Sequence, residues 1–494
     1  MEETFDMFRM RLEHMVRMDH PLVVLGSRIK WVEIEKSLSH LFQRKPREVR
    51  ELELEDLFGT HRAVVVPGVS RAGRKRLPFR LMASLLYLKH AFNESDESVV
   101  ERWGESPIWQ MFSGEIYFEH RAPCDASLLS RFRRLMGEEG VEELLAQTVT
   151  AAVEMKVIDP KELESIIVDS TVQEKAVAHP TDSNLLETAR EKLVEAAREE
   201  QLPVKQTYEK EGKTLNRKIG RYAHAKQHGR LKKALKRQRT VVGRLARDVQ
   251  RKAEKAVGGV KSKLALTLEK ANRIVEQSRQ KKRVGDTPKL YSFHAPEVEC
   301  ISKGKSRKPY EFGVKVGIAT TWSGNLIVGT RAFAGNPYDG HTLREQVEQA
   351  TILMQDTGVV PKTVFVDLGY RGVDYDNPGV QIIHRGKSKR LGLKWMAKLK
   401  RRQAVEPIIG HLKSDHGMDR CHLKGSLGDS IHAVLCSAGY NLRWLLRMIL
   451  KNGIRHFFRL VFDFIDKAKS GRKFEDAKLG NGLICSAGQF VPVG

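Results

Sequence analysis

Hydrophobic positions in the first third of the chain recur at helical spacing. Apolar residues recur every one to four positions between Leu77 and Leu88, and Pro78 stands near the start of this stretch. This pattern predicts a helix with a wide apolar face. A second helical stretch follows Ser95, where valines and tryptophans are placed to pack on the first. This pattern predicts a helical N-terminal domain over residues 1–155.

A further helix is predicted after Asp125 and Ser127, which are favourable cap residues. Its second face carries Arg131, Arg133 and Arg134. These arginines have two interpretations. They are DNA contacts of a helix-turn-helix domain, or they form the solvated face of an ordinary helical domain, and periodicity does not separate the two.

The pattern changes to strand-like runs near residue 165. Runs rich in β-branched residues predict strands at residues 165–169, 298–302, 310–320, 326–332, 363–367 and 379–384. Helices are predicted at residues 342–355 and 393–413, and Pro407 is expected to kink or restart the second one. We therefore predict an α/β core made of residues 160–181 and 291–450, followed by a C-terminal tail at residues 451–494 that is loose beyond Lys467.

Residues 182–290 interrupt this core with helical periodicity. Narrow apolar seams, such as Leu235, Val242, Leu245 and Val249, run along otherwise basic stretches and are interrupted at Gly258-Gly259. This pattern predicts a helical hairpin inserted into the core.

The basic charge is concentrated in two segments. The 494 residues carry a formal net charge of +25, of which +20 falls between Lys205 and Arg283 and +9 between Arg385 and Lys424, while the rest is slightly acidic. The few acids of the insertion cannot pair with most of its lysines, so we expect a track for double-stranded DNA rather than only a solvated face. The residues predicted to contact DNA there are Lys232, Lys233, Lys236 and Arg237.

Other classes of protein are excluded by composition. Five cysteines without a C-x-x-C pair speak against a disulfide framework and against a zinc ribbon. The first residues are acidic where a signal peptide is basic and then apolar, and the apolar stretch from Ile431 to Leu450 contains Asn441 and two arginines. We expect no membrane partner and a reducing, cytoplasmic location.

Two carboxylates follow apolar strands, Asp169 and Asp367. Acids that converge from strand ends form a hard oxygen site for Mg²⁺ or Mn²⁺, and two such ions support phosphodiester displacement without a side-chain nucleophile. The alternative is that each acid only begins a turn, and this alternative is favoured for a single aspartate. Pattern alone leaves the choice open.

Two further polar groups have competing interpretations. Asp339 and His341, in a polar loop after the third predicted strand, line the site or form a plain turn. His411, His416, His422 and Cys421 resemble a metal cluster, but their helical spacing spreads them over different faces, which favours exposure to solvent or DNA.

The residues around three acids resemble the DDE transposases of bacterial insertion sequences, in the group with a Y-R-E-K signature. Arg402, Glu406 and Lys413 reproduce the spacing of arginine, glutamate and lysine in that signature. Asp367-Leu-Gly369-Tyr370 is similar to the group's D-x-G-[YF] block, and Val168-Asp169-Ser-Thr is similar to its first block. One position departs, because Leu399 stands where the signature has tyrosine.

The resemblance implies an RNase H-like α/β core in which Asp169, Asp367 and Glu406 are catalytic and bind metal, two Mg²⁺ or Mn²⁺ ions. Arg402 and Lys413 are then read as backbone-phosphate contacts near the scissile bond, because cations beside a carboxylate suit bound phosphates. The expected fold is this core with a helical N-terminal domain that binds DNA ends and a long basic helical insertion.

The implied function is transposition. The enzyme would bind terminal inverted repeats, cleave DNA at the ends of the element and join 3′-hydroxyls to target DNA. It would act on the bacterial nucleoid, as a homodimer when assembled on DNA. Two alternatives remain: a catalytically inactive, transposase-derived DNA-binding protein, and a general nuclease on the same fold.

Overall fold

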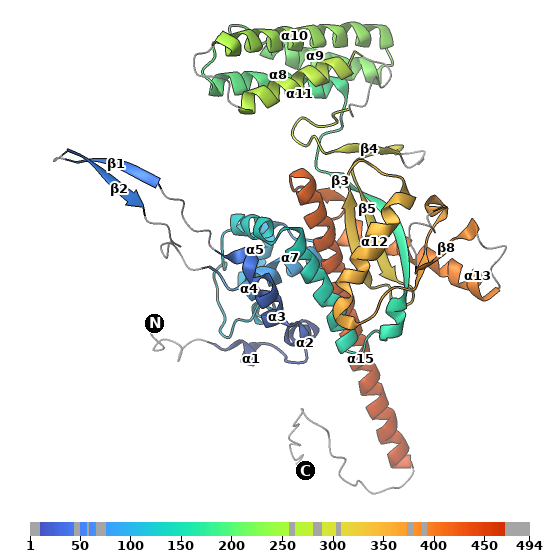
Figure 1. Cartoon of the computed structure of the whole chain (residues 1–494). Coiled ribbons are helices and arrows are strands. Elements are labelled where there is room, and N and C mark those ends of the chain that lie inside the picture. The colour runs from blue at the N-terminus through green and yellow to red at the C-terminus, as the bar shows by residue number, and fades with distance from the viewer. Residues whose placement is uncertain are drawn as a thin grey trace, which may run out of the picture. The chain divides into compact units, whose positions relative to one another are not determined.

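The computed structural model describes residues 10–43, 50–56, 59–65, 76–255, 262–279, 289–302, 308–372, 379–386 and 393–469 (Figure 1). By its contacts the chain divides into two units, Met1–Leu445 and Leu446–Gly494. The predicted break at Gly258-Gly259 and the tail beyond residue 469 lie outside the described residues.

The N-terminal part is mainly helical, as predicted. Its helices are α1 (Leu12–Met15), α2 (Pro21–Arg28), α3 (Trp31–Ser37), α4 (Phe79–Phe92), α5 (Asp96–Glu105), α6 (Pro107–Phe112) and α7 (Ala126–Glu154), with a 3₁₀ turn at Leu38–Phe42. Local chemistry sets their starts: Pro78 precedes α4, Ser95 forms a capping box with Ser98, and Asp125 accepts a hydrogen bond from the Ser127 amide.

The all-helical prediction for this region is wrong in one place. Strands β1 (Arg50–Asp56) and β2 (Gly59–Val65) form an antiparallel hairpin. Strand β1 alternates polar and apolar residues, a period of two that is typical of a strand and was not used in the prediction.

The core is a mixed sheet built on one long central strand. Its strands are β3 (Ser165–Lys175), β4 (Glu299–Ser302), β5 (Tyr310–Thr321), β6 (Ile327–Phe333), β7 (Thr363–Phe365), β8 (Gln381–Ile383) and β9 (Arg420–Cys421). The order is β4-β5-β3-β7-β8, and β6 also pairs with β5 while β9 pairs with β3. Strands β4, β5 and β6 run antiparallel to their neighbours, whereas β7 and β8 continue from β3 in parallel. Strands β4 to β8 lie where the sequence predicted them, β3 extends beyond its predicted end, and β9 was not predicted.

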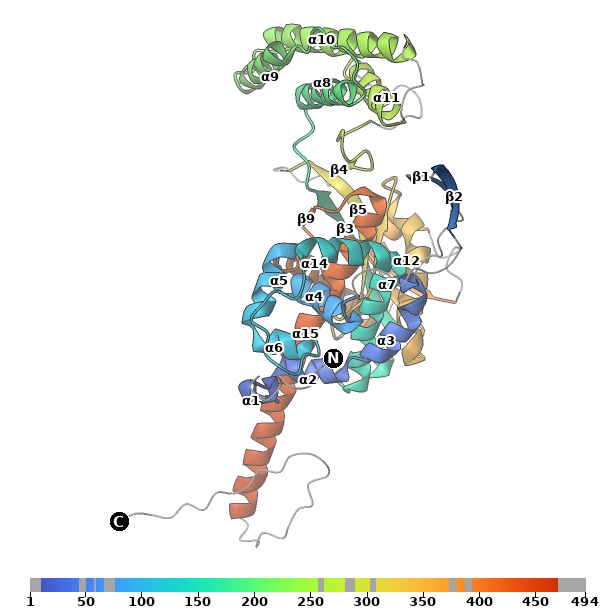
Figure 2. The ribbon, with the colours of Figure 1, turned by 90° about the vertical axis from the view of Figure 1, so that its left-hand side faces the viewer.

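Helices α7, α12 (Asp339–Leu353) and α15 (Gly425–Lys469) pack along the antiparallel side of the sheet (Figures 1 and 2). Gln349 of α12 donates a hydrogen bond to the Thr330 carbonyl on β6 at 3.0 Å. Buried Asn441 of α15 donates to the Ile327 carbonyl at 2.7 Å and to Thr148 Oγ1 of α7 at 2.9 Å. The N-terminal helices therefore share an interior with the sheet, and the buried Asn441 amide, which bonds to both β6 and α7, connects them.

A second apolar cluster joins the parallel side of the sheet to a broken helix. Ile167, Phe365 and Ile383 of β3, β7 and β8 pack with Val405. The helix predicted over residues 393–413 is divided into α13 (Leu393–Lys400), a 3₁₀ turn at Arg401–Ala404, and α14 (Val405–Asp415). Pro407 lies in the first turn of α14, where a missing amide costs no hydrogen bond. The helix therefore restarts at Val405, two residues before Pro407, where the restart was expected.

The insertion forms four helices where a hairpin was predicted: α8 (Asp182–Glu199), α9 (Glu209–His224), α10 (His228–Lys255) and α11 (Ser262–Gln277) (Figure 1). Helices α8, α10 and α11 share a core that includes Leu186, Leu193, Val242, Leu245 and Ile274. Each apolar seam is too narrow to form a water-free core with a single partner helix. Several helices therefore bury their seams in one shared core.

Within the described part of the chain, no helix has both the length and the apolar character needed to cross a bilayer. Trp444 of α15 is buried and donates its indole N–H to the Gly324 carbonyl at 3.0 Å, as expected of a core residue.

Candidate active site

Asp169 lies in the middle of β3, and the prediction that it ends the strand is wrong. The strand was predicted to stop at its first charged residue, but β3 continues to Lys175 because β5 pairs with it from Ile166 to Glu174 and β9 pairs with its last two residues. The neighbour on the other side, β7, pairs with β3 only up to Ile167 and Phe365. Asp169 and Asp367 each lie two residues beyond this last pair, at the same end of the paired segment.

Asp367 caps the 3₁₀ turn that follows β7. Its Oδ1 accepts a hydrogen bond from the Gly369 amide at 2.7 Å. A Cβ at Gly369 would lie 2.9 Å from Asp367 Oδ1 and 3.1 Å from Asp339 Oδ2. A glycine at this position therefore lets two carboxylates approach the same backbone atom, which is the physical reason for glycine in the Asp-x-Gly block.

Asp339, at the start of α12, lies near the same place, and we call Asp169, Asp367 and Asp339 the acidic group. Its Oδ1 accepts a hydrogen bond from Ser170 Oγ at 3.1 Å and lies 3.0 Å from the ammonium of Lys315. The sequence analysis left Asp339 undecided between a site residue and a turn residue, and the structure places it beside Asp367. His341 is exposed, and its ring packs edge-on against Tyr338.

The hydroxyl of Tyr370 is influenced by the charges of all three aspartates. Its side chain is buried, and burial raises the pKa of the hydroxyl well above its usual value, with further increases from the negative charges of Asp339, Asp169 and Asp367. Tyr370 is therefore uncharged at any physiological pH.

Arg402 connects the broken helix to β3. Its Nη1 donates to Asp169 Oδ2 at 3.0 Å, and both side chains are mostly buried. Glu406 follows one helical turn later in the first turn of α14, with an exposed side chain. Ala404 and Val405 both have right-handed helical backbone angles, so the turn continues from Arg402 to Glu406. Lys413 lies half-buried near the end of the same helix.

Leu399, at the position of the signature tyrosine, packs against the cluster formed by Ile167, Phe365, Ile383 and Val405. It also forms one wall of a cavity beside Asp367, which is lined in addition by Arg385, Lys400, Arg402 and Gln403. The cavity therefore combines one acid with three cations and a leucine wall.

The donor set of the acidic group fits a hard divalent cation. Asp169, Asp367 and Asp339 offer only carboxylate oxygens, and Lys315 and Arg402 offset part of their charge. Oxygen ligands with excess negative charge are what Mg²⁺ and Mn²⁺ prefer. Glu406 is placed on the helix that Arg402 anchors to Asp169.

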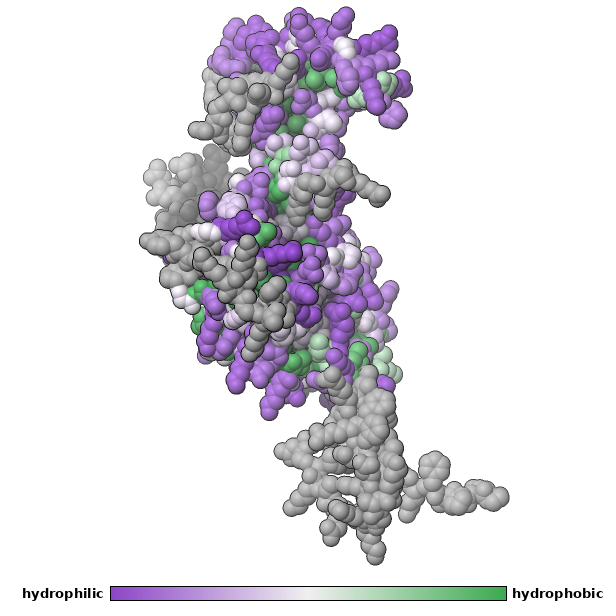
Figure 3. Space-filling view, turned by 90° about the vertical axis from the view of Figure 1, so that its right-hand side faces the viewer, coloured by the Kyte–Doolittle hydropathy of each residue, from purple (hydrophilic) through white to green (hydrophobic). Residues whose placement is uncertain are grey.

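The predicted DNA contacts are mostly exposed. Lys232, Lys233, Lys236 and Arg237 lie on the surface of α10, where Arg237 pairs with Glu211 at 2.6 Å. The view in Figure 3 shows hydrophilic side chains gathered over the helices of the insertion.

The three arginines of α7 differ. Arg131 and Arg134 are exposed, but Arg133 is buried and its Nη1 donates to Asp96 Oδ1 at 2.7 Å. The placement of Arg133 on an exposed DNA-facing surface is therefore wrong. Its guanidinium neutralises a carboxylate between α5 and α7, a long-range partner that local periodicity does not reveal.

Two transposase families match parts of the chain. The family described as Transposase domain (DUF772) matches residues 10–135, and the family described as Transposase DDE domain matches residues 377–446, a range that contains Arg402 and Glu406. An uncharacterised protein, ORF8 in the nfe locus of Rhizobium meliloti, is 38% identical over 222 residues, which cover 45% of this chain and 94% of that protein. No solved structure matches the chain.

Proposed function

The chain belongs to the DDE transposases, and we propose that it mobilises an insertion sequence by cleaving DNA at the ends of the element and joining the 3′-hydroxyls to target DNA. The observation that carries this proposal is the acidic group around Gly369, with Arg402 bound to Asp169 and Glu406 one turn beyond it. The position of Asp169 and Asp367 at the same end of the paired segment of β3 and β7 supports the assignment of both as catalytic, with Glu406 as the third acid.

Asp169, Asp367 and Glu406 would hold the metal, proposed to be two Mg²⁺ or Mn²⁺ ions. When bound, such ions activate a water or hydroxyl and stabilise the leaving oxygen of the phosphodiester. The protein's own contribution is placement. Ser170 holds Asp339, the Gly369 amide holds Asp367, and Arg402 holds Asp169, so the carboxylates are oriented before DNA arrives.

The cations beside the acids suit a phosphate backbone. Arg385, Lys400 and Arg402 line the cavity next to Asp367, and we assign them to phosphates near the scissile bond, with Lys413 further along α14. Leu399 contributes an apolar wall in place of a tyrosine hydroxyl. Phosphate binding at this cavity therefore rests on the cations.

Transposases bind DNA, and we assign two surfaces to that role. The exposed lysines of α10 would hold the phosphate backbone without reading sequence. The exposed Arg131 and Arg134 of α7 would lie at the DNA ends bound by the N-terminal helices. The complex on DNA is proposed to be a homodimer acting on the bacterial nucleoid.

The test of this function is cleavage of a duplex that carries the inverted repeats found beside the coding frame. With Mg²⁺, the purified protein is expected to nick at the repeat boundary and leave a scrambled duplex intact. Binding without nicking would identify a catalytically inactive DNA-binding protein. Equal cleavage of both duplexes would identify a general nuclease.

Replacing Asp339 with asparagine should reduce cleavage about 10- to 100-fold, the usual effect of losing a group that orients metal ligands. Asparagine still accepts a hydrogen bond from Ser170, but it no longer balances Lys315, whose charge would then oppose a cation at Asp367. The measurement is the Mg²⁺ concentration at half-maximal cleavage, which should rise in this variant.

The matched control is Asp356→Asn, an exposed aspartate just beyond the other end of α12. It should leave the Mg²⁺ dependence unchanged. An Asp339→Asn protein with normal Mg²⁺ dependence would show that Asp339 has no role in placing the acids.

A further inference from the structure

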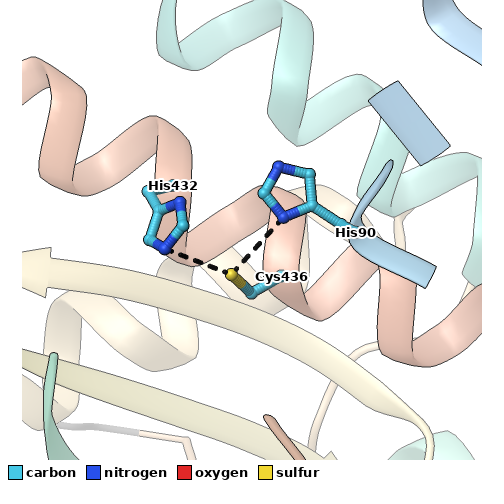
Figure 4. A group of neighbouring side chains, drawn as sticks. All are labelled: His90, His432 and Cys436. Atoms are coloured by element: carbon cyan, nitrogen blue, oxygen red, sulfur yellow. Dashed lines mark hydrogen bonds between the residues drawn. The ribbon is translucent and has the colours of Figure 1, made fainter. Parts of the chain in front are cut away.

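A second group of ligand side chains lies apart from the acids, where α4 packs against α15. His90 comes from α4, while His432 and Cys436 are one turn apart on α15. Figure 4 shows both imidazoles directed at the Cys436 sulfur. Cys436 Sγ lies 3.6 Å from His90 Nδ1 and 3.7 Å from His432 Nε2. Among the described residues, this is the one group of three histidine, cysteine, aspartate or glutamate side chains whose ligand atoms all lie within 4.8 Å of one another.

These separations are those of ligands around a tetrahedral ion. With Zn–S and Zn–N bonds of their usual lengths, a tetrahedral angle separates sulfur from nitrogen by about 3.6 Å. A hydrogen bond from a thiol to an imidazole has a similar length, so the experiment must separate a metal site from a hydrogen-bonded core cluster.

The surroundings favour a borderline or soft cation over the hard ion of the acidic site. The three side chains are 4%, 8% and 0% exposed, and they offer nitrogen and sulfur. Burial lowers the pKa of His90 well below its usual value and that of His432 to about 4, so both imidazoles are in the neutral form that binds metal. Burial also raises the pKa of the Cys436 thiol, so a bound metal would displace its proton.

Backbone contacts hold the cluster in place. His416 Nδ1 lies 2.8 Å from the carbonyl oxygen of His90. The Gly417 carbonyl oxygen lies 3.0 Å from His432 Nε2, the nitrogen that would bind the ion, so it accepts a hydrogen bond from this ring only while the ion is absent. His416 and Cys421 are buried, contrary to the expectation that they face solvent or DNA, whereas His411 and His422 are exposed as expected. His416 and Gly417, which follow α14, thus contact the junction of α4 and α15. The Gly417 carbonyl oxygen or a water is available as a fourth ligand.

We propose that His90, His432 and Cys436 bind one Zn²⁺ ion that fastens the N-terminal helices to α15. The site is distinct from the acids in position and in ligand chemistry. Because α15 also holds β6 and α7 through Asn441, an ion at this junction would couple the N-terminal helices to the sheet. Zn²⁺ that binds the folded chain and not the unfolded chain raises the melting temperature.

The experiment uses the full chain, freed of metal with a chelator and titrated with Co²⁺ and then Zn²⁺. Thiolate ligation gives Co²⁺ a sulfur-to-metal charge-transfer band in the near ultraviolet, which carboxylates at the acidic site cannot give. We expect about one equivalent of Co²⁺ to produce this band, Zn²⁺ to abolish it, and Zn²⁺ to raise the melting temperature.

Cys436→Ser and His432→Ala should remove the band, while Cys421→Ser should keep it. Cys421 is the matched control because it is also buried and lies nearby in sequence, with its thiol directed at the carbonyls of Leu423 and Gly428. Absence of the band in the wild-type chain would overturn the proposal without any variant. A band that survives Cys436→Ser and disappears in Cys421→Ser would overturn it as well.

Discussion

Replacing Asp169 with asparagine should reduce Mg²⁺-dependent cleavage of end-containing DNA at least about 1,000-fold, because a bound metal contributes several kcal/mol of transition-state stabilisation. The asparagine carbonyl can still accept the hydrogen bond from the Ser170 amide, now 2.8 Å away, while the amide nitrogen replaces the oxygen that accepts from Arg402. The fold and the DNA-binding surfaces should therefore persist while the charge that attracts the cation is lost. Glu406→Gln should have an effect of the same order. Cleavage is measured as nicked product per unit time, and binding is measured on the same duplex.

Glu174→Gln provides the control for this pair. Glu174 is a carboxylate on the same strand, and it pairs with Lys308. Its replacement removes a negative charge from β3 without touching the acidic group, so cleavage should stay close to the wild-type rate. Undiminished cleavage by Asp169→Asn, or an equal loss in Glu174→Gln, would contradict the assignment of Asp169 as catalytic.

Replacing Arg133 with methionine should lower the free energy of unfolding by about 3 kcal/mol, near the lower end of the cost of breaking a buried ion pair. Arg133 and Asp96 are 5% and 15% exposed, and Asp96 would be left with Lys89 at 2.7 Å as its remaining cation. The measurement is urea unfolding followed by circular dichroism. Arg134→Met, on the exposed side of the same helix, should change stability by less than about 0.5 kcal/mol.

Acid unfolding gives an independent check of the same pair. Burial raises the pKa of Asp96, but hydrogen bonds and charge from Arg133 and Lys89 outweigh it and lower the pKa from 3.8 to about 2. A depressed pKa stabilises the folded state fully above the unfolded value, and this contribution is lost as the pH falls from 3.8 towards 2. Arg133→Met should lose less stability than wild type across that interval. Equal losses would mean that Arg133 does not hold the pKa of Asp96 down.

The starts of several helices could be predicted from the sequence because the residues that cause them lie within a few positions of the first turn. The starts of α4, α5 and α7 follow from Pro78, Ser95 and Asp125, whose effects reach only a few residues. Most strands of the sheet were predicted from runs of β-branched residues, and the break in the helix near Pro407 from the missing amide. The acid blocks were found for a similar reason, since each is a short segment whose spacing is visible in one dimension.

Pairing between distant residues was decided by the tertiary structure. The length of β3 depends on β5, so the strand does not stop at Asp169. Burial of Arg133 depends on Asp96 in another helix, and no local pattern distinguishes Arg133 from its exposed neighbour Arg134. A narrow apolar seam on one helix does not say how many partners will cover it, which is why the insertion has four described helices instead of two.

The composition of the acidic group shows the same division. The sequence by itself determined an α/β chain with basic segments and with carboxylate blocks at strand and helix positions, because periodicity and motif spacing are properties of neighbouring residues. The tertiary structure decided that Asp339 joins Asp367 around Gly369, and that His90 meets Cys436. Contacts of this kind depend on how the elements pack. Side chains far apart in the chain come together only when their elements bury apolar surface against each other.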